Sequence, residues 1–100
     1  MAYWSFDEAR KAQLISALTE GLAALRAKVN LSQAGLAEAV GISRQTYNAI
    51  ESGGKPMSWR TYLALLLYFD CNPGTSAMLR SLHIFPEELN NEEDIRSHQD

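Results

Sequence analysis

The stretch LSQAGLAEAVGISRQTYNAIESGGK, residues 31–55, sets polar side chains inside a run of apolar residues spaced three and four apart. Such spacing is typical of amphipathic α-helices. Four polar residues fall together near the middle of the stretch: Arg44, Gln45, Thr46 and Asn48. On an ordinary solvated helix face they would have no special role. Whether these four residues form a functional site therefore depends on the structure predicted for the segments around them.

Two short helices joined by a tight turn are predicted within this stretch. Residues 32–40 form the first, and Gly41 can take the left-handed conformation that ends a helix. Ser43 can cap the second helix, residues 44–51, which Gly53 closes. So short a connection makes the two helices cross at a steep angle. That arrangement is the helix-turn-helix motif.

The second of these helices has two different faces. Tyr47 and Ile50 are three residues apart and are expected to point into the core. The polar residues fall on the other side or at the N-terminal end. Arginine can pair two-pronged with guanine, and glutamine or asparagine with adenine. The helix therefore has one face for folding and one that can read base-pair edges.

The segment before the motif is predicted to be one long helix. Ser5 can cap it, with Glu8 completing a capping box, and Asn30 can end it. Gly21 weakens the helix without ending it. The apolar residues expected on its inner face are Ile15, Leu18, Leu22 and Leu25.

Two more helices and a short turn are predicted after the motif. Ser58 can cap a helix over residues 59–69, and Asn72 with Pro73 can begin one that ends near His83. Residues 85–89 suit a short turn. The first of these helices is apolar on more than one side. Its expected core residues are Trp59, Tyr62, Leu63, Leu66 and Phe69. Those that need another cover, from a neighbouring helix or a second subunit, are Leu65, Leu67 and Tyr68.

The composition indicates one small all-α domain. The chain has 100 residues, of which 46% are hydrophobic, and we expect a single domain over residues 1–89 with a disordered acidic tail over 90–100. The lone Cys71 excludes an internal disulfide and fits a reducing compartment. No segment resembles a signal peptide or a membrane span, so a soluble cytoplasmic protein is expected. His83 and His98 lie apart from other ligand types, so no metal site is predicted.

Charge is unevenly distributed along the chain, although the net charge is only −3. Residues 9–60 carry seven basic against three acidic residues, a net charge of +4. Residues 61–100 carry two basic against seven acidic residues, a net charge of −5. Solvated surface charge is the simplest explanation. A basic front and an acidic tail are also compatible with a nucleic-acid partner.

The motif resembles the phage repressor and Cro-type (XRE-like) helix-turn-helix family over about residues 20–70. The matching positions are Leu25-Arg26, Leu31-Ser32-Gln33, Leu36-Ala37, Gly41-Ile42-Ser43 and Ile50-Glu51-Ser52-Gly53. The resemblance implies a compact five-helix repressor-like domain, here with an N-terminal helical extension. It also implies a homodimer that binds double-stranded operator DNA without a cofactor.

The resemblance further assigns residue roles. Arg44 and Gln45 would meet base edges, Thr46 and Asn48 would contact phosphate or bases, and Gln33 would touch phosphate and a neighbouring recognition residue. Arg26 and Glu51 would form a structural ion pair. The full set of expected DNA-binding residues is Gln33, Ser43, Arg44, Gln45, Thr46, Asn48, Lys55 and Arg60.

Two functions are therefore compatible with the sequence. The first is a sequence-specific transcriptional regulator, a repressor that binds a palindromic operator as a dimer. The second is an antitoxin that binds a partner toxin and its own promoter, with the acidic tail as the segment that folds on the partner. An enzyme is not expected, because no nucleophile, base and orienting group occur together. Gly53-Gly54-Lys55 lacks the spacing of a phosphate-binding loop.

Overall fold

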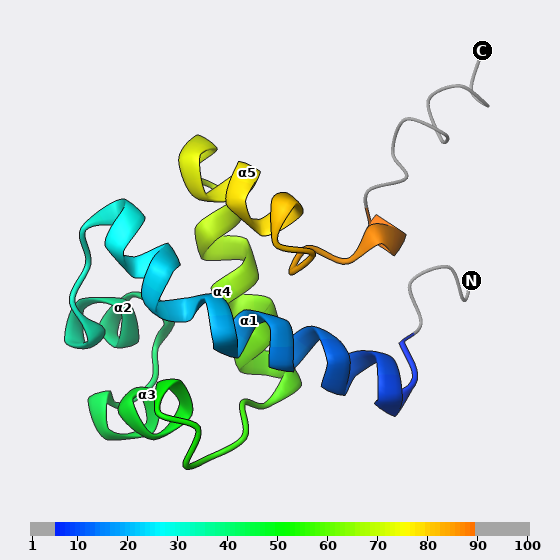
Figure 1. Cartoon of the computed structure of the whole chain (residues 1–100). Helices are drawn as coiled ribbons and strands as arrows, with labels where there is room; N and C mark the ends of the chain where they lie inside the picture. The colour runs from blue at the N-terminus through cyan, green and yellow to red at the C-terminus, as the bar shows by residue number, and fades with distance from the viewer. Residues whose placement is uncertain (1–5, 90–100) are drawn as a thin grey trace.

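The computed structural model describes residues 6–89, which form five α-helices and one short 3-10 helix (Figure 1). In chain order these are α1 (Glu8–Val29), α2 (Gln33–Val40), α3 (Arg44–Glu51), α4 (Trp59–Asp70), α5 (Pro73–Ser81) and η1 (Glu87–Leu89). No strand occurs in this range. The predicted all-α, five-helix fold is thus confirmed. The predicted disordered tail, residues 90–100, lies outside the described residues.

Short polar side chains begin the helices by accepting backbone hydrogen bonds. Ser43 and Ser58 cap α3 and α4, as predicted. Ser32, expected as the first residue of its helix, is instead the cap of α2. The start expected for α1 was wrong. Its cap is Asp7, whose Oδ1 accepts from the backbone N–H of Arg10 at 2.7 Å, so Glu8 is the first helical residue rather than part of a capping box. Ser5 lies outside the described residues.

Residues in the left-handed conformation lie at or just beyond the ends of four of the helices, among them Gly53 after α3, with φ 84°. Asn30 has φ 58° after α1 and Gly41 has φ 79° after α2, both as predicted. At the α2–α3 turn, the N–H of Ile42 donates to the carbonyl of Ala37 at 3.0 Å, which closes α2 while the chain reverses. α5 ends earlier than predicted, at Ser81, and His83 has φ 58° just beyond it.

Packing among the helices selects faces that differ in detail from those expected. On α1, Leu18, Leu22 and Leu25 are buried as predicted, but the fourth buried residue is Leu14, whereas Ile15 is half-buried. On α4, Leu65 is buried and Leu63 is 41% exposed, the reverse of the prediction. The reason is that α4 contacts α5, α1 and α2, so its neighbours decide which of its apolar sides are covered.

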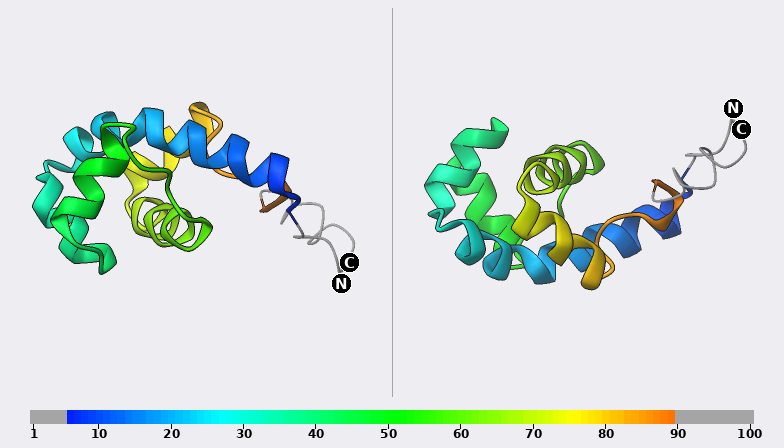
Figure 2. Two further views of the ribbon diagram at one scale, coloured as in Figure 1. Left: turned by 90° about the horizontal axis from the view of Figure 1, so that it is seen from below. Right: turned by 90° about the horizontal axis from the view of Figure 1, so that it is seen from above.

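α1 runs along the molecule and joins its two ends (Figures 1 and 2). One end holds α2 and α3. At the other, the segment after α5 returns to lie against α1. A Cβ at Gly21 would come within 2.8 Å of Ile84 Cδ1, so the glycine makes room for this segment. The hydroxyl of Tyr62 donates to the carbonyl of Ile84 at 2.7 Å and holds the segment against α4 as well.

Candidate nucleic-acid interface

α3 presents one buried face and one open face. Tyr47 and Ile50 are buried, as predicted from their spacing. Arg44 and Gln45, in the first turn, are exposed, and neither side chain hydrogen-bonds to a described residue. Asn48 is half-buried and lies between the two faces. The open face therefore offers free guanidinium and amide groups, the donors and acceptors that can match base edges.

Ser43 and Thr46 form a local pair at the start of α3. The Ser43 hydroxyl oxygen accepts from the backbone N–H of Thr46 at 3.0 Å. The same hydroxyl donates its proton to Thr46 Oγ1 at 2.8 Å. Thr46 keeps its own hydroxyl proton, which remains free to be donated to an external acceptor such as a phosphate oxygen.

Glu51, at the end of α3, is held by groups from three helices. Its Oε1 accepts from Arg26 Nη2 at 2.8 Å and from Gln33 Nε2 at 3.1 Å. Its Oε2 accepts from Arg26 Nε at 2.9 Å and from the Tyr47 hydroxyl. A carboxylate at a helix C-terminus opposes the helix dipole, and the Arg26 guanidinium offsets this effect. The cluster orients α3 relative to α1 and α2.

The same cluster shifts two pKa values. Hydrogen bonds from Arg26 hold the pKa of Glu51 below its usual range, against the opposing effect of burial. Burial, together with the hydrogen bond to Glu51, raises the pKa of Tyr47. The whole Tyr47 side chain is buried, and its hydroxyl binds Glu51. The four-residue spacing of the two on one helix was the signal for this contact.

Gln33, in the first turn of α2, is joined to the recognition helix through its amide. One N–H of Nε2 is donated to Glu51 at the end of α3, not to a residue of the first turn of α3. The second N–H and the carbonyl oxygen make no hydrogen bond to a described residue. Gln33 thus keeps a donor for a phosphate, although the contact itself stays a prediction.

The three cations of the motif differ from the described arginines elsewhere in the chain, which have acidic partners. Arg44, Lys55 and Arg60 are exposed and form no ion pair within residues 6–89. Within residues 6–89, the arginines other than Arg44 and Arg60 are paired: Arg10 with Glu88, Arg26 with Glu51 and Arg80 with Asp70. Between residues 39 and 69 the only acid is Glu51, which Arg26 neutralises. A surface with a net positive potential results.

Sequence reasoning did not single out Lys28. It is exposed in the last turn of α1 and, like the cations of the motif, forms no ion pair within the described range. Lys28 lies at a helix C-terminus, where the helix dipole favours a cation. This position accounts for an unpaired lysine there without a bound ligand.

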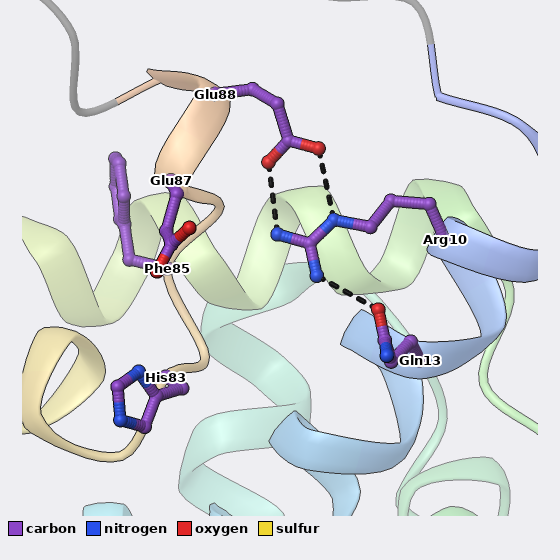
Figure 3. Close-up of a pocket in the computed structure, with 6 residues that line it drawn as sticks. All are labelled: Arg10, Gln13, His83, Phe85, Glu87 and Glu88. Carbon is purple, nitrogen blue, oxygen red and sulfur yellow. Dashed lines mark hydrogen bonds and ion pairs between the residues drawn. The ribbon is translucent and has the colours of Figure 1, made fainter.

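A polar pocket of about 530 Å³ lies at the other end of the molecule, where η1 meets the start of α1 (Figure 3). Arg10 makes two hydrogen bonds of 2.9 Å to Glu88 there and a third, of 3.0 Å, to Gln13. The guanidinium is thus already occupied by groups of the chain. This pocket is separate from α3 and contributes nothing to a DNA-reading surface.

Other kinds of site find no support in the part of the chain that the structure describes. Within residues 6–89 no three His, Cys, Asp or Glu side chains come together to hold a metal ion. In the same range no helix is both long enough and apolar enough to span a membrane.

Comparison with protein families agrees with this geometry. Residues 17–76 match the model of a family described as a helix-turn-helix domain. The chain belongs to this family, which contains the Cro-type and XRE-like proteins. Searches of curated proteins and of solved structures found no match to the chain. All the expected DNA-binding residues lie within the matched segment, and membership supports DNA binding by a sequence-specific regulator.

Proposed function

We propose that this chain is a cytoplasmic transcriptional repressor that binds a palindromic operator as a homodimer, and that it has no enzymatic activity. Arg44 and Gln45 read base edges in the major groove. Lys55 and Arg60 meet phosphates, and so do the free donors of Gln33 and Thr46. Ser43 supports this contact indirectly, because its hydroxyl donates to Thr46 Oγ1 and leaves the Thr46 proton free. The folded unit comprises residues 1–89.

The observation that carries this proposal is the contrast between free and paired cations. Arg44, Lys55 and Arg60 are exposed and without an acidic partner in the described chain, and they come from α3, the loop after it and the start of α4. An unpaired guanidinium or ammonium is ready to neutralise phosphate and release counterions. Paired arginines such as Arg26 are committed to the fold instead.

The test is a titration against a duplex selected from a random pool and against an unrelated duplex, at several salt concentrations. Arg44→Ala should reduce the preference for the selected duplex, since a two-pronged base contact contributes about 1–3 kcal/mol of discrimination. Lys55→Ala should weaken binding to both duplexes alike and lower the salt slope by about 0.9, the change expected when one phosphate is no longer neutralised. Equal losses of affinity on both duplexes for Arg44→Ala would contradict base reading.

The dimer is proposed from apolar surface left open on α4. Leu67 is 67% exposed and lies in an apolar hollow of about 370 Å³ between α2 and α4. The hollow is lined by Ala39, Val40, Ala64, Leu67, Tyr68 and Cys71. Two-fold symmetry would place two α3 helices in successive major grooves, about 34 Å apart.

Sedimentation tests the oligomer. Wild type should sediment as a dimer at micromolar concentration or on DNA, and Leu67→Glu should shift it towards monomer, because a buried charge opposes association. Ala12→Glu, an exposed site on α1 away from the hollow, is the matched control and should have no effect. A wild type that is monomeric both free and on DNA would contradict the proposal.

The antitoxin function is a second candidate, favoured by the charge of the C-terminal segment. Residues 87–100 hold six acidic residues and one arginine. A segment of this kind can order itself on a basic partner. Co-expression with a toxin encoded beside this chain tests the idea. Neutralisation that disappears on removing residues 90–100 would support it, and neutralisation that survives the truncation would exclude the tail as the binding segment.

A further inference from the structure

Asn48 carries an unpaired polar atom inside the protein. Its side-chain Oδ1 is buried and has no hydrogen-bond partner, and it is the one such side-chain atom within residues 6–89. The Nδ2 of the same amide makes no hydrogen bond to a described residue and is not buried. A buried acceptor without a partner lowers stability, because it no longer has its hydrogen bonds to water. Such an exception calls for an explanation.

The orientation of the amide limits what Asn48 can recognise. Two-pronged pairing with adenine needs both the carbonyl oxygen and the N–H donors of the side chain at the base edge. With Oδ1 turned into the protein, only Nδ2 is offered outwards. Turning the amide over would bury its two N–H donors and offer only the carbonyl oxygen outwards, so neither orientation presents both groups to a base edge. A single outward donor suits a single acceptor oxygen.

The position of Asn48 points to the DNA backbone as the source of that acceptor. It lies one helical turn after the exposed Arg44, so the two share a side of α3. Unlike Arg44 it is half-buried, beside the core face that holds Tyr47. Phosphate oxygens are the acceptors that most protein–DNA hydrogen bonds use, and asparagine is among the side chains that donate to them.

We propose that Asn48 is a sequence-independent phosphate anchor, which donates one hydrogen bond from Nδ2 and has its carbonyl oxygen buried at a cost in stability. The inference rests on the proposed function, because it assumes that α3 enters DNA. It separates Asn48 from Arg44 and Gln45, which specify bases. It also separates Asn48 from Lys55, because a neutral donor displaces no counterion.

Asn48→Ala in the full chain tests the assignment against the selected and the unrelated duplex. Binding to both should weaken by the same factor, about 10- to 150-fold for one hydrogen bond to a charged oxygen. The salt slope should match that of wild type, whereas the control Lys55→Ala should reduce it. The melting temperature should rise, because the unpaired acceptor is gone and alanine favours the helix.

A gain in stability together with a uniform fall in affinity would be hard to explain by a structural role alone. Loss of preference at one base position would overturn the assignment in favour of base reading. A lower melting temperature would show that the amide supports the fold instead. If wild type binds normally and Asn48→Ala binds equally well, Asn48 does not contact a phosphate. The proposed function of the protein would not be affected by that result. Failure of wild type to bind any selected duplex would overturn both.

Discussion

Two arginine–glutamate pairs with nearly the same geometry occur at opposite ends of α1. Arg26 meets Glu51 through contacts of 2.8 and 2.9 Å, and Arg10 meets Glu88 through two contacts of 2.9 Å. Both are two-pronged, the geometry in which arginine binds a carboxylate most strongly. From the distances alone, the two pairs would be expected to stabilise the fold equally.

Their surroundings are not equal. The side chains of Arg26 and Glu51 are 18% and 13% exposed, against 30% and 33% for Arg10 and Glu88. Glu51 also accepts from Tyr47 and Gln33, so that removing it leaves several buried donors unpaired. The Arg10 pair is open to water, which replaces either partner at little cost. Burial and neighbouring donors, rather than the hydrogen-bond distances, decide how much such a pair contributes to the stability of the fold.

Glu51→Ala should have the largest effect. Removal of one partner from a buried pair leaves an uncompensated charge, so the free energy of unfolding should fall by roughly 3–5 kcal/mol. Urea unfolding followed by circular dichroism measures this decrease. Glu38→Ala is the matched control, because Glu38 is exposed on α2 and forms no ion pair within the described residues. Equal stability of the two variants would mean that the Glu51 cluster is not formed in solution.

Acid should remove part of the same stabilisation. The pKa of Glu51 is lowered in the folded protein, chiefly by Arg26. Its carboxylate therefore stabilises the fold fully above the unfolded pKa of about 4.3, and this contribution disappears as the pH falls through the folded pKa. The free energy difference between wild type and Glu51→Gln should thus be constant above about pH 5 and shrink below it. A difference that stays constant down to about pH 2 would contradict the lowered pKa.

Glu88→Ala should have the smallest effect. A partly exposed pair contributes about 0.2–1 kcal/mol, and salt should reduce this further. Glu87→Ala is the neighbouring control, since Glu87 lines the same pocket without an ion pair to a described residue. Double-mutant cycles on both pairs isolate the two coupling energies. A larger coupling for Arg10–Glu88 than for Arg26–Glu51 would reverse the comparison drawn from burial.

The pattern of residues was enough to predict the local features of the helix-turn-helix unit. α3 spans residues 44–51 as expected, and α2 begins and ends within one residue of its predicted bounds. Ser43 and Gly41 succeed as signals because a cap or a left-handed closing residue acts on backbone groups only a few residues away. The basic, amide-rich composition of the outer face of α3 was likewise visible in the chain.

Features that depend on neighbours in space could not be predicted from the pattern of residues. The choice of Leu65 over Leu63 as a core residue follows from the three helices packed around α4, which apolar spacing does not reveal. The Arg10–Glu88 pair joins residues 78 positions apart. The inward turn of the Asn48 carbonyl is likewise set by packing around α3. Caps and turns are local interactions, whereas burial, pairing and side-chain orientation depend on which distant segments pack together.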